Sequence, residues 1–361
     1  MDRRSFLKTS AIGGSAAAAS SLAAPAIAQG QVKLTMVTMW PRGLAGVWDS
    51  AVRFADNVAA MSEGQMTVDV KAAGELVGAL EIFDAVAAGQ ADMYHGADYY
   101  FVGQHPAFAF FTGVPFGMTA PEIMTWYYAG KGMEDHHMLG EIFGLKSFLV
   151  GQTASQGGGW FRKPIETVDD FKGLKFRMPG FGAEALSKLG ASIQVLPGGE
   201  IYQALSTGAL DGTEWIGPWS DEKLGLQEVC DYYYPASFHE PGAAISVATN
   251  LSVYEGLTPG QQQIIKIAAA EAHQANYALF IANNGPALQR LRQGGTQLRQ
   301  FSDEIWDAFS VAVDEVMDGF MDDDLYAGIR ANYDASLAQT SDWISQSDGE
   351  YSRQRNRIRG G

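Results

Sequence analysis

Stretches of alternating apolar and polar residues recur along the chain and predict β-strands. The alternation is plain in Val32–Trp40, Met66–Val70 and Ala243–Asn250, and the apolar run Leu145–Gln152 is predicted as a further strand. Runs with apolar residues at helical spacing lie between the strands, as in Val47–Met61. Because strands and helices alternate, the sequence predicts an α/β fold with mainly parallel sheets.

The pattern becomes mostly helical towards the C-terminus. Thr258 and Gln261 are spaced to form a capping box, and the helix they open is predicted to run to about Leu291. Further helices are predicted from Ser302 through Met321 and from Leu325 to about Arg355. The chain is therefore expected to combine α/β units with a long helical C-terminal region.

The N-terminal residues 1–28 have the features of an export signal. Arg3–Lys8 resembles a twin-arginine motif, a weakly apolar run follows in Ala11–Ala24, and Ala26–Ala28 fits a small-residue cleavage site. The run is too short and too rich in glycine and serine to span a membrane. The mature protein is expected to begin at Gln29 and to be exported to the periplasm.

The charge balance restricts the partners. The net charge is −16, and loss of residues 1–28 removes three basic residues and one acidic residue, which moves it to −18. A protein this acidic is a poor candidate for binding nucleic acid or an anionic membrane. If it binds an anion, an arginine or a bound cation has to supply positive charge locally. With one cysteine, Cys230, the chain can form no disulfide within itself.

About 330 mature residues are enough for two domains. An internal similarity points the same way, because Ala87–Met93 and Ser206–Gly212 each contain a helix end, a glycine and an aspartate that opens a strand. Chance recurrence of a common turn explains this similarity equally well.

The segment Asp211–Pro218 is the strongest candidate for a binding site. It is predicted as a strand between two helices, and Glu214 stands in it among apolar residues. A buried carboxylate is costly unless a cation meets it, whereas Trp215 beside it forms an apolar wall. We interpret the segment as the floor of a ligand site with Glu214 against a metal ion or an arginine. The alternative is an exposed carboxylate at a strand end.

Motifs of catalysis and cofactor binding are scarce. Gly180–Ala185 matches the dinucleotide pattern G-x-G-x-x-A, but it follows Pro179 and would place Glu184 against the pyrophosphate, so we interpret it as a tight turn near a small ligand. Neither G-x-S-x-G nor H-E-x-x-H occurs in the sequence. Three other clusters lack the spacing of a metal site, namely His136–His137, His239–Glu240 and Asp322–Asp324.

Four polar residues at strand ends and loops together make chemical sense: Gln156, Arg177, Glu214 and Glu240. A guanidinium offers a planar fork for a carboxylate. Two carboxylates, an amide oxygen and a backbone carbonyl suit a hard cation, which can also bind the ligand. A 2-oxo or 2-hydroxy acid has the oxygens that such a site requires.

At these residues the chain resembles the periplasmic solute-binding subunits of tripartite ATP-independent periplasmic (TRAP) transporters, and within them the branch that binds 2-oxo acids and lactate. The matching runs span nearly the whole mature chain. They are Ala73–Val77, Gln156 with Gly158–Arg162, Gly173–Lys175 with Arg177, Asp211–Pro218, Asp221–Gly225 and Tyr254–Pro259.

The resemblance implies a two-lobe Venus-flytrap fold that closes over its ligand and no catalysis. On this basis lobe I comprises residues 29–152 with 241–300 returning to it, lobe II comprises 153–240, and 301–361 form the helical region. In some members of the branch such helices mediate dimerisation, and Leu325–Arg355 is suited to this role.

The resemblance also implies a role for each candidate residue. The arginine at position 177 grips the ligand carboxylate, and Tyr100 contacts the ligand. Sodium or calcium is held by Gln156, Glu214, Glu240 and the backbone oxygen of Trp215. Phe101 stands where relatives can have a third tyrosine, so a hydroxyl contact to the ligand is in question.

The sequence therefore predicts an exported subunit that delivers a small 2-oxo or 2-hydroxy monocarboxylate to membrane transport subunits. Two alternatives remain at this point. One is an exported cofactor-dependent oxidoreductase, since such enzymes often use twin-arginine export, and the other is a ligand-sensing subunit of a signalling system.

Overall fold

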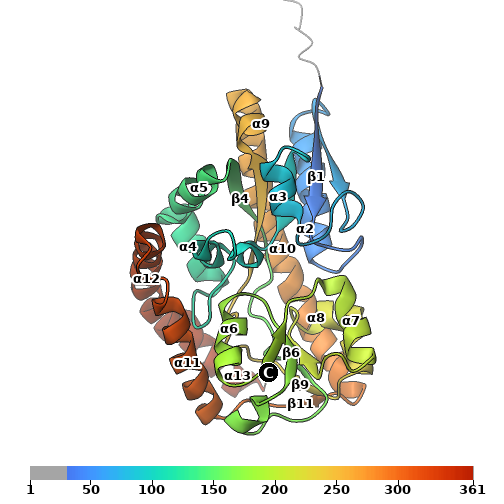
Figure 1. The fold of residues 1–361 in the computed structure, drawn as a ribbon, viewed down its shortest axis with the longest axis vertical. Helices are drawn as coiled ribbons and strands as arrows, with labels where there is room; N and C mark the ends of the chain where they lie inside the picture. Colours follow the sequence, from blue (N-terminus) through green and yellow to red (C-terminus); the bar gives the residue numbers. More distant parts are fainter. Residues whose placement is uncertain (1–30, 361) are drawn as a thin grey trace, which may run out of the picture.

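The computed structural model describes residues 31–360, so the predicted signal peptide lies outside the described residues. The first of two sheets has the strand order β2-β1-β3-β10-β4 and forms the centre of the upper lobe in Figure 1. Its strands are β1 (Val32–Thr38), β2 (Met66–Lys71), β3 (Met93–Gly96), β4 (Leu145–Gln152) and β10 (Ala244–Asn250).

The second sheet belongs to the lower lobe and has the order β11-β9-β5-β8-β6-β7. Its strands are short: β5 (Gly159–Phe161), β6 (Lys175–Arg177), β7 (Ser192–Gln194), β8 (Gly212–Thr213), β9 (Tyr232–Tyr234) and β11 (Gln297–Leu298). Because β11 pairs with β9, residues 297–298 lie in the second sheet. The predicted return of the whole segment 241–300 to lobe I is wrong at this strand, whereas β10 does join the first sheet.

Helices surround both sheets. In the two lobes they are α2 (Val47–Met61), α3 (Ile82–Ala87), α4 (Ala120–Ala129), α5 (Gly132–Ile142), α6 (Gly180–Lys188), α7 (Gly198–Ser206), α8 (Pro218–Leu224) and α9 (Leu251–Gly256). The C-terminal part contains α10 (Pro259–Gln293), α11 (Asp303–Asp318), α12 (Asp324–Ile344) and α13 (Glu350–Arg359).

Both sheets are mixed: five strand pairings are parallel and four are antiparallel, so the predicted parallel character holds for only part of each sheet. In the first sheet, β1 is parallel to β2 and β3, but β10 is antiparallel to β3 and β4. In the second sheet, β5 is antiparallel to β8 and β9. A helical crossover makes neighbouring strands parallel, whereas β10 enters its sheet directly from the second lobe and is free to run the other way.

The long helix α10 spans the two lobes, as Figure 1 shows in orange. Thr258 and Gln261 form the predicted capping box at its start. Asn276 on this helix donates to the carbonyl of Gly46 at 2.7 Å and accepts from the backbone of Gln152 at 3.0 Å, both in the first lobe. About two turns further along the helix, Asn284 accepts from the backbone of Trp219 in the second lobe at 3.1 Å. The helix is thus hydrogen-bonded to both lobes.

The C-terminal helices α11 and α12 lie along one side of both lobes (Figure 1). Tyr326 on α12 is buried between Phe110 of the first lobe and Phe181 of the second, at ring-centroid distances of 5.3 and 6.4 Å. Tyr333, about two turns further along α12, accepts from the backbone of Met118 at 2.6 Å. The beginning of α12 is therefore covered by its own chain. Within the described residues no helix is long and apolar enough to cross a membrane.

Candidate functional site

The segment that follows β8 is a buried loop, held by one carboxylate. Asp221 accepts from the backbone of Ile216 at 3.0 Å, from Gly217 at 2.9 Å and from the indole of Trp160 at 2.8 Å. These bonds turn the backbone away from the sheet, so the predicted strand Asp211–Pro218 is paired only at Gly212–Thr213. Burial raises the pKa of Asp221 to about 7, against the effect of the three donors.

Replacing Asp221 by alanine is expected to lower the free energy of unfolding by about 3 kcal/mol, because three buried donors lose their acceptor. Urea unfolding measures this loss. The control is Glu222→Ala, which removes an ion pair with the half-exposed Arg290 and should cost less than about 1 kcal/mol. Equal losses in the two variants would show that Asp221 does not hold the loop.

Arg177 ends β6 and is completely buried. Its Nε donates to the carbonyl of Leu196 at 3.0 Å, and its two amino groups reach the carboxylate of Glu214 and the hydroxyl of Tyr100. The guanidinium lies 5.2 Å from the ring centre of Trp215. Burial by itself would lower the pKa of Arg177, but Tyr100 and Glu214 raise it above its ordinary value, so the side chain stays charged.

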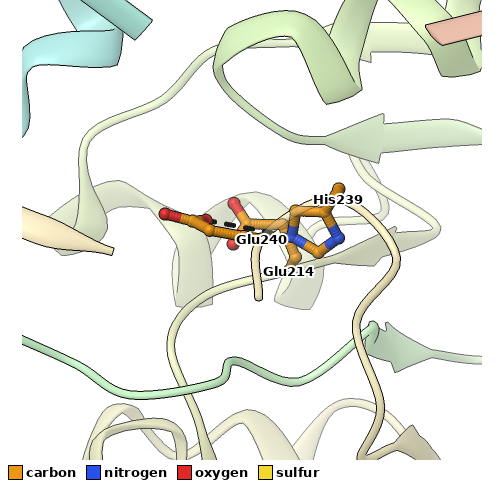
Figure 2. Close-up of side chains that lie close together, drawn as sticks. All are labelled: Glu214, His239 and Glu240. Carbon is orange, nitrogen blue, oxygen red and sulfur yellow. Dashed lines mark ion pairs between the residues drawn. The ribbon is translucent and has the colours of Figure 1, made fainter. Parts of the chain in front are cut away.

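Two carboxylates and an imidazole lie close together, as Figure 2 shows, and one of the carboxylates is the ion-pair partner of Arg177. Glu214, His239 and Glu240 are buried, and each offers a ligand atom within 4.8 Å of the others. The Nε2 atom of His239 is 3.6 Å from Glu214 Oε2 and 4.0 Å from Glu240 Oε2, beyond hydrogen-bond length. The Nε2 atom of His239 therefore makes no hydrogen bond to either carboxylate.

Gln156 joins the same cluster from the loop after β4. Its amide nitrogen donates to Thr153 at 3.2 Å, and its backbone N–H donates to the carbonyl of Glu240 at 3.3 Å. Three buried oxygens of the described site have no hydrogen-bond partner: Gln156 Oε1, Glu214 Oε2 and Glu240 Oε1. Buried polar atoms are normally paired, and this set of oxygens fits a hard cation such as sodium or calcium.

The charge of Glu240 is unfavourable in the protein without a cation. Burial, and after it the charge of Glu214, raise the pKa of Glu240 well above its ordinary value, although Arg177 acts in the opposite direction. The carboxyl of Glu240 therefore holds a proton at a pH where an exposed glutamate would have lost it. A cation bound here would release that proton.

This shift predicts a pH dependence of stability. Because the folded-state pKa of Glu240 is raised, its favourable contribution is complete below the ordinary pKa and is lost as pH rises through the folded value. In cation-free buffer, wild type should therefore lose stability relative to Glu240→Gln as pH rises above the ordinary glutamate pKa of about 4.3. Urea unfolding of both proteins across this range tests it, and parallel pH curves would contradict it.

The structure places all the predicted site residues together and adds one that the sequence had excluded. Tyr100 reaches the site from the first lobe, and Trp215 follows Glu214. His239 was dismissed because the spacing His239–Glu240 is not that of a metal site, yet the fold brings it to Glu214 from another segment. Gly182 makes room for it, since a Cβ there would lie 2.9 Å from the Cβ of His239.

Phe101 and the dinucleotide-like motif lie outside the cluster of site residues. The ring of Phe101 points into the core of the first lobe, with its centroid 4.9 Å from that of Phe83, so it does not face the site. Gly180, which has a positive φ of 64°, begins α6 and lies against Tyr99. The whole motif lies in the first turns of α6, so the tight turn predicted for it is confined to Gly180 at the start of the helix.

A cavity of about 10 Å³ lies between the lobes at this site. Aromatic, aliphatic and amide side chains line it, among them Trp40, Val47, Tyr100, Gln156, Trp215 and Ile245. Such a volume holds about one water molecule. Contacts of Tyr100 with Arg177 and of Trp40 with Trp215 join the two lobes here, so the structure has them in a closed arrangement.

Comparison with known proteins decides the family. Residues 46–324 match the model of "Bacterial extracellular solute-binding protein, family 7". The chain belongs to this family. It is 42% identical over 313 residues to a monocarboxylate 2-oxoacid-binding periplasmic protein of Nostoc sp. strain PCC 7120, with 85% of this chain and 86% of the relative covered.

Solved structures of TRAP periplasmic solute-binding proteins have the same fold. One from Pseudoalteromonas atlantica T6c, with bound sodium and pyruvate, has a TM-score of 0.87 at 35% identity, covering 90% of this chain and 99% of that one. One from Colwellia psychrerythraea, with bound calcium and pyruvate, has a TM-score of 0.87 at 34% identity and the same coverage.

These findings confirm the family resemblance and the fold class that the sequence predicted. The protein is a family 7 solute-binding protein of the TRAP type, with two α/β lobes and a helical C-terminal region. The prediction that it is not an enzyme is confirmed, because the family and its similar members bind solutes, and the oxidoreductase alternative is therefore set aside. The predicted periplasmic location agrees with that of these relatives.

Proposed function

We propose that this protein binds a small 2-oxo or 2-hydroxy monocarboxylate through Arg177 and a bridging cation. The observation that carries the proposal is the set of three unpaired buried oxygens beside a completely buried arginine. The relatives that bind a 2-oxo acid, and pyruvate with sodium or calcium, support the same ligand class.

Each residue has a distinct part in the proposed complex. Arg177 would offer its planar fork to the ligand carboxylate. In this structure Tyr100 and Glu214 occupy the two amino groups that the ligand would bind. Gln156, Glu214, Glu240 and the backbone oxygen of Trp215 would hold sodium or calcium. The cation, when bound, supplies positive charge that offsets the carboxylates and attracts the 2-oxygen of the ligand.

Arg177 and the metal ligands lie in the second lobe and the connecting loops, whereas Tyr100 reaches them from the first lobe. A ligand held by both lobes would stabilise the closed arrangement, because it binds that arrangement better than an open one. We infer that the closed, loaded protein delivers its acid to a large and a small membrane subunit of a TRAP transporter. Export through the twin-arginine route, with residues 1–28 as signal peptide, is part of this proposal.

Thermal unfolding of the mature protein against a panel of acids tests the ligand class. The panel contains pyruvate, longer 2-oxo acids, lactate and propionate, each with sodium, calcium or chelator. A 2-oxo or 2-hydroxy acid with a cation should raise the midpoint, since a ligand that binds only the folded state stabilises it by mass action. A protein stabilised equally by propionate, or by none of the acids, would overturn the proposal.

We further propose that the distal part of the C-terminal region mediates a homodimer. Three apolar side chains there are strongly exposed: Trp343 at 73%, Tyr351 at 67% and Ile358 at 66%. Large exposed apolar residues on one helical segment are typical of a contact surface. The beginning of α12, with Tyr326 and Tyr333 buried on its own chain, is not part of this surface.

The dimer proposal predicts that removal of residues 341–361 yields a monomer with unchanged affinity for its acid. Sedimentation velocity of the mature and truncated proteins measures the oligomeric state. A mature protein that sediments as a monomer at about 100 μM would contradict the proposal, since stable homodimers of proteins form well below that concentration.

A further inference from the structure

Asp98 is a completely buried carboxylate of the first lobe to which the proposed function assigns no role. It opens the 3-10 turn η1 (Asp98–Phe101), which follows β3. Tyr94 of β3 donates to its Oδ1 atom at 3.0 Å, and Ser246 of β10 donates to its Oδ2 atom at 2.5 Å. The Nε2 atom of His136 on α5 also lies 3.0 Å from Oδ2. This one carboxylate thus connects the turn to three elements of the first lobe.

The partners of the turn are themselves held in place. The ring of Phe111 stacks on that of His136 at a centroid distance of 4.1 Å and an angle of 7°. The backbone N–H of Tyr99 in the turn donates to the hydroxyl of Thr112 at 3.2 Å. Both His136 and Thr112 are completely buried. Because buried polar networks of this kind rigidify the structure around them, η1 is held in one position.

The turn carries two tyrosines that face the second lobe. The hydroxyl of Tyr100 reaches the guanidinium of Arg177, whose central carbon lies 5.9 Å from the ring centre of Tyr100. Burial, and after it the charge of Glu240, raise the pKa of Tyr99 well above its ordinary value, so its hydroxyl keeps its proton beside the carboxylates. Both tyrosines follow Asp98 directly in the chain, so a displaced Asp98 would move both hydroxyls relative to the ligand site.

A contribution to stability alone does not account for a carboxylate at this position. Among the described ion pairs, Asp98 has a histidine as partner and no lysine or arginine. A buried charge is costly, and well-packed apolar residues of similar volume often stabilise a protein as much or more. Two hydroxyl donors with fixed directions, however, allow one orientation of the carboxylate. What Asp98 supplies is therefore the orientation of the turn that presents Tyr99 and Tyr100.

We propose that Asp98 is a positioning residue that holds Tyr99 and Tyr100 against the ligand site and thereby sets how long the closed protein retains its acid. This inference rests on the proposed function, because it assumes that the acid and the cation bind beside Arg177. The two tyrosines come from the first lobe and meet a site built mainly by the second, so they act once the lobes have closed. Loosening them should speed release and leave association almost unchanged.

The first test is Asp98→Asn. Asparagine keeps the size of the side chain but must turn its amino group towards one of the two hydroxyl donors. Stopped-flow mixing of the mature protein with pyruvate at saturating calcium, followed by tryptophan fluorescence, gives both rates from one concentration series. Release should be about tenfold faster than in wild type or more, and association should change by less than about threefold.

A background without the two tyrosine hydroxyls separates positioning from a general loss of structure. In the Tyr99→Phe/Tyr100→Phe protein, Asp98→Asn should change the release rate by less than about twofold, because no hydroxyl remains to be positioned. A defect of the fold would act alike in both backgrounds. The control is Asp92→Asn, at the opposite end of β3, where the carboxylate accepts from the backbone of Thr35 at 2.7 Å. This variant should release pyruvate like wild type.

Ser246→Ala keeps the carboxylate and removes one of its donors, so it tests the same point if Asp98→Asn does not fold. It should speed release by about threefold. The inference is overturned if the folded variants release pyruvate at the wild-type rate, or if Asp98→Asn acts equally with and without the tyrosine hydroxyls. A wild-type protein that binds no pyruvate with sodium or calcium would overturn the proposed function, and this inference with it.

Discussion

Arg177→Lys is expected to bind pyruvate about 100-fold or more weakly than wild type, with little change in fold. An ammonium keeps the positive charge that Glu214 requires, but it cannot present two parallel N–H donors to a carboxylate. Loss of a buried charge-assisted pair costs about 2–5 kcal/mol, and about 1.4 kcal/mol corresponds to a factor of ten. Isothermal titration with saturating calcium measures the affinity.

Arg299→Lys is the matched control for this variant. Arg299 also belongs to the second lobe, but it lies on the surface, 5.5 Å from the ring centre of Tyr232. It should bind pyruvate like wild type. If Arg177→Lys retained wild-type affinity while remaining folded, Arg177 would not be the residue that holds the ligand carboxylate.

Glu240→Gln is expected to weaken cation binding by more than about tenfold, and the affinity for pyruvate at limiting calcium should fall with it. Mutation of residues that only support metal ligands typically lowers the affinity for the metal by about 10–100-fold. Glu240 itself supplies one of the unpaired oxygens, so its effect should be at least as large. The glutamine keeps an oxygen and a similar volume, so packing around the site should be preserved. Titration of calcium at saturating pyruvate measures the effect.

Here Glu228→Gln serves as control, because Glu228 is exposed and its carboxylate contacts only the hydroxyl of Tyr202 at 3.0 Å. Equal calcium affinity in wild type and Glu240→Gln would exclude Glu240 as a ligand. Since burial makes the charge of Glu240 costly without a cation, the variant should also be at least as stable as wild type in chelator at pH 8.

Local sequence patterns predicted those elements whose signals lie within the elements themselves. The bounds of α2 and β4 agree with Val47–Met61 and Leu145–Gln152, because apolar spacing and flanking glycines mark their ends. The capping box at Thr258 likewise located the start of α10. Strand direction depends on where a chain enters its sheet, and nothing within Ala244–Asn250 encodes that, so the antiparallel β10 could not be predicted.

The residues of the candidate site also divide into those with a local sequence signal and those without one. Glu214 and Arg177 were found from the sequence because a charge in an apolar run requires a partner. The roles of Asp221 and His239 could not be predicted in this way, because their partners Trp160 and Glu214 are distant in sequence. Trp40 had no polar signal at all. Its ring meets that of Trp215 from the other lobe, a contact that the local sequence does not encode.

Titration of pyruvate at a series of calcium concentrations tests whether the ligand and the cation share one site. Coupling between two ligands is reciprocal, so the apparent Kd for pyruvate should fall as calcium rises, and pyruvate should tighten calcium binding by the same factor. In chelator and sodium-free buffer, pyruvate binding should be almost lost. The same Kd for pyruvate with and without cations would contradict the bridged site, although the fold and family would stand.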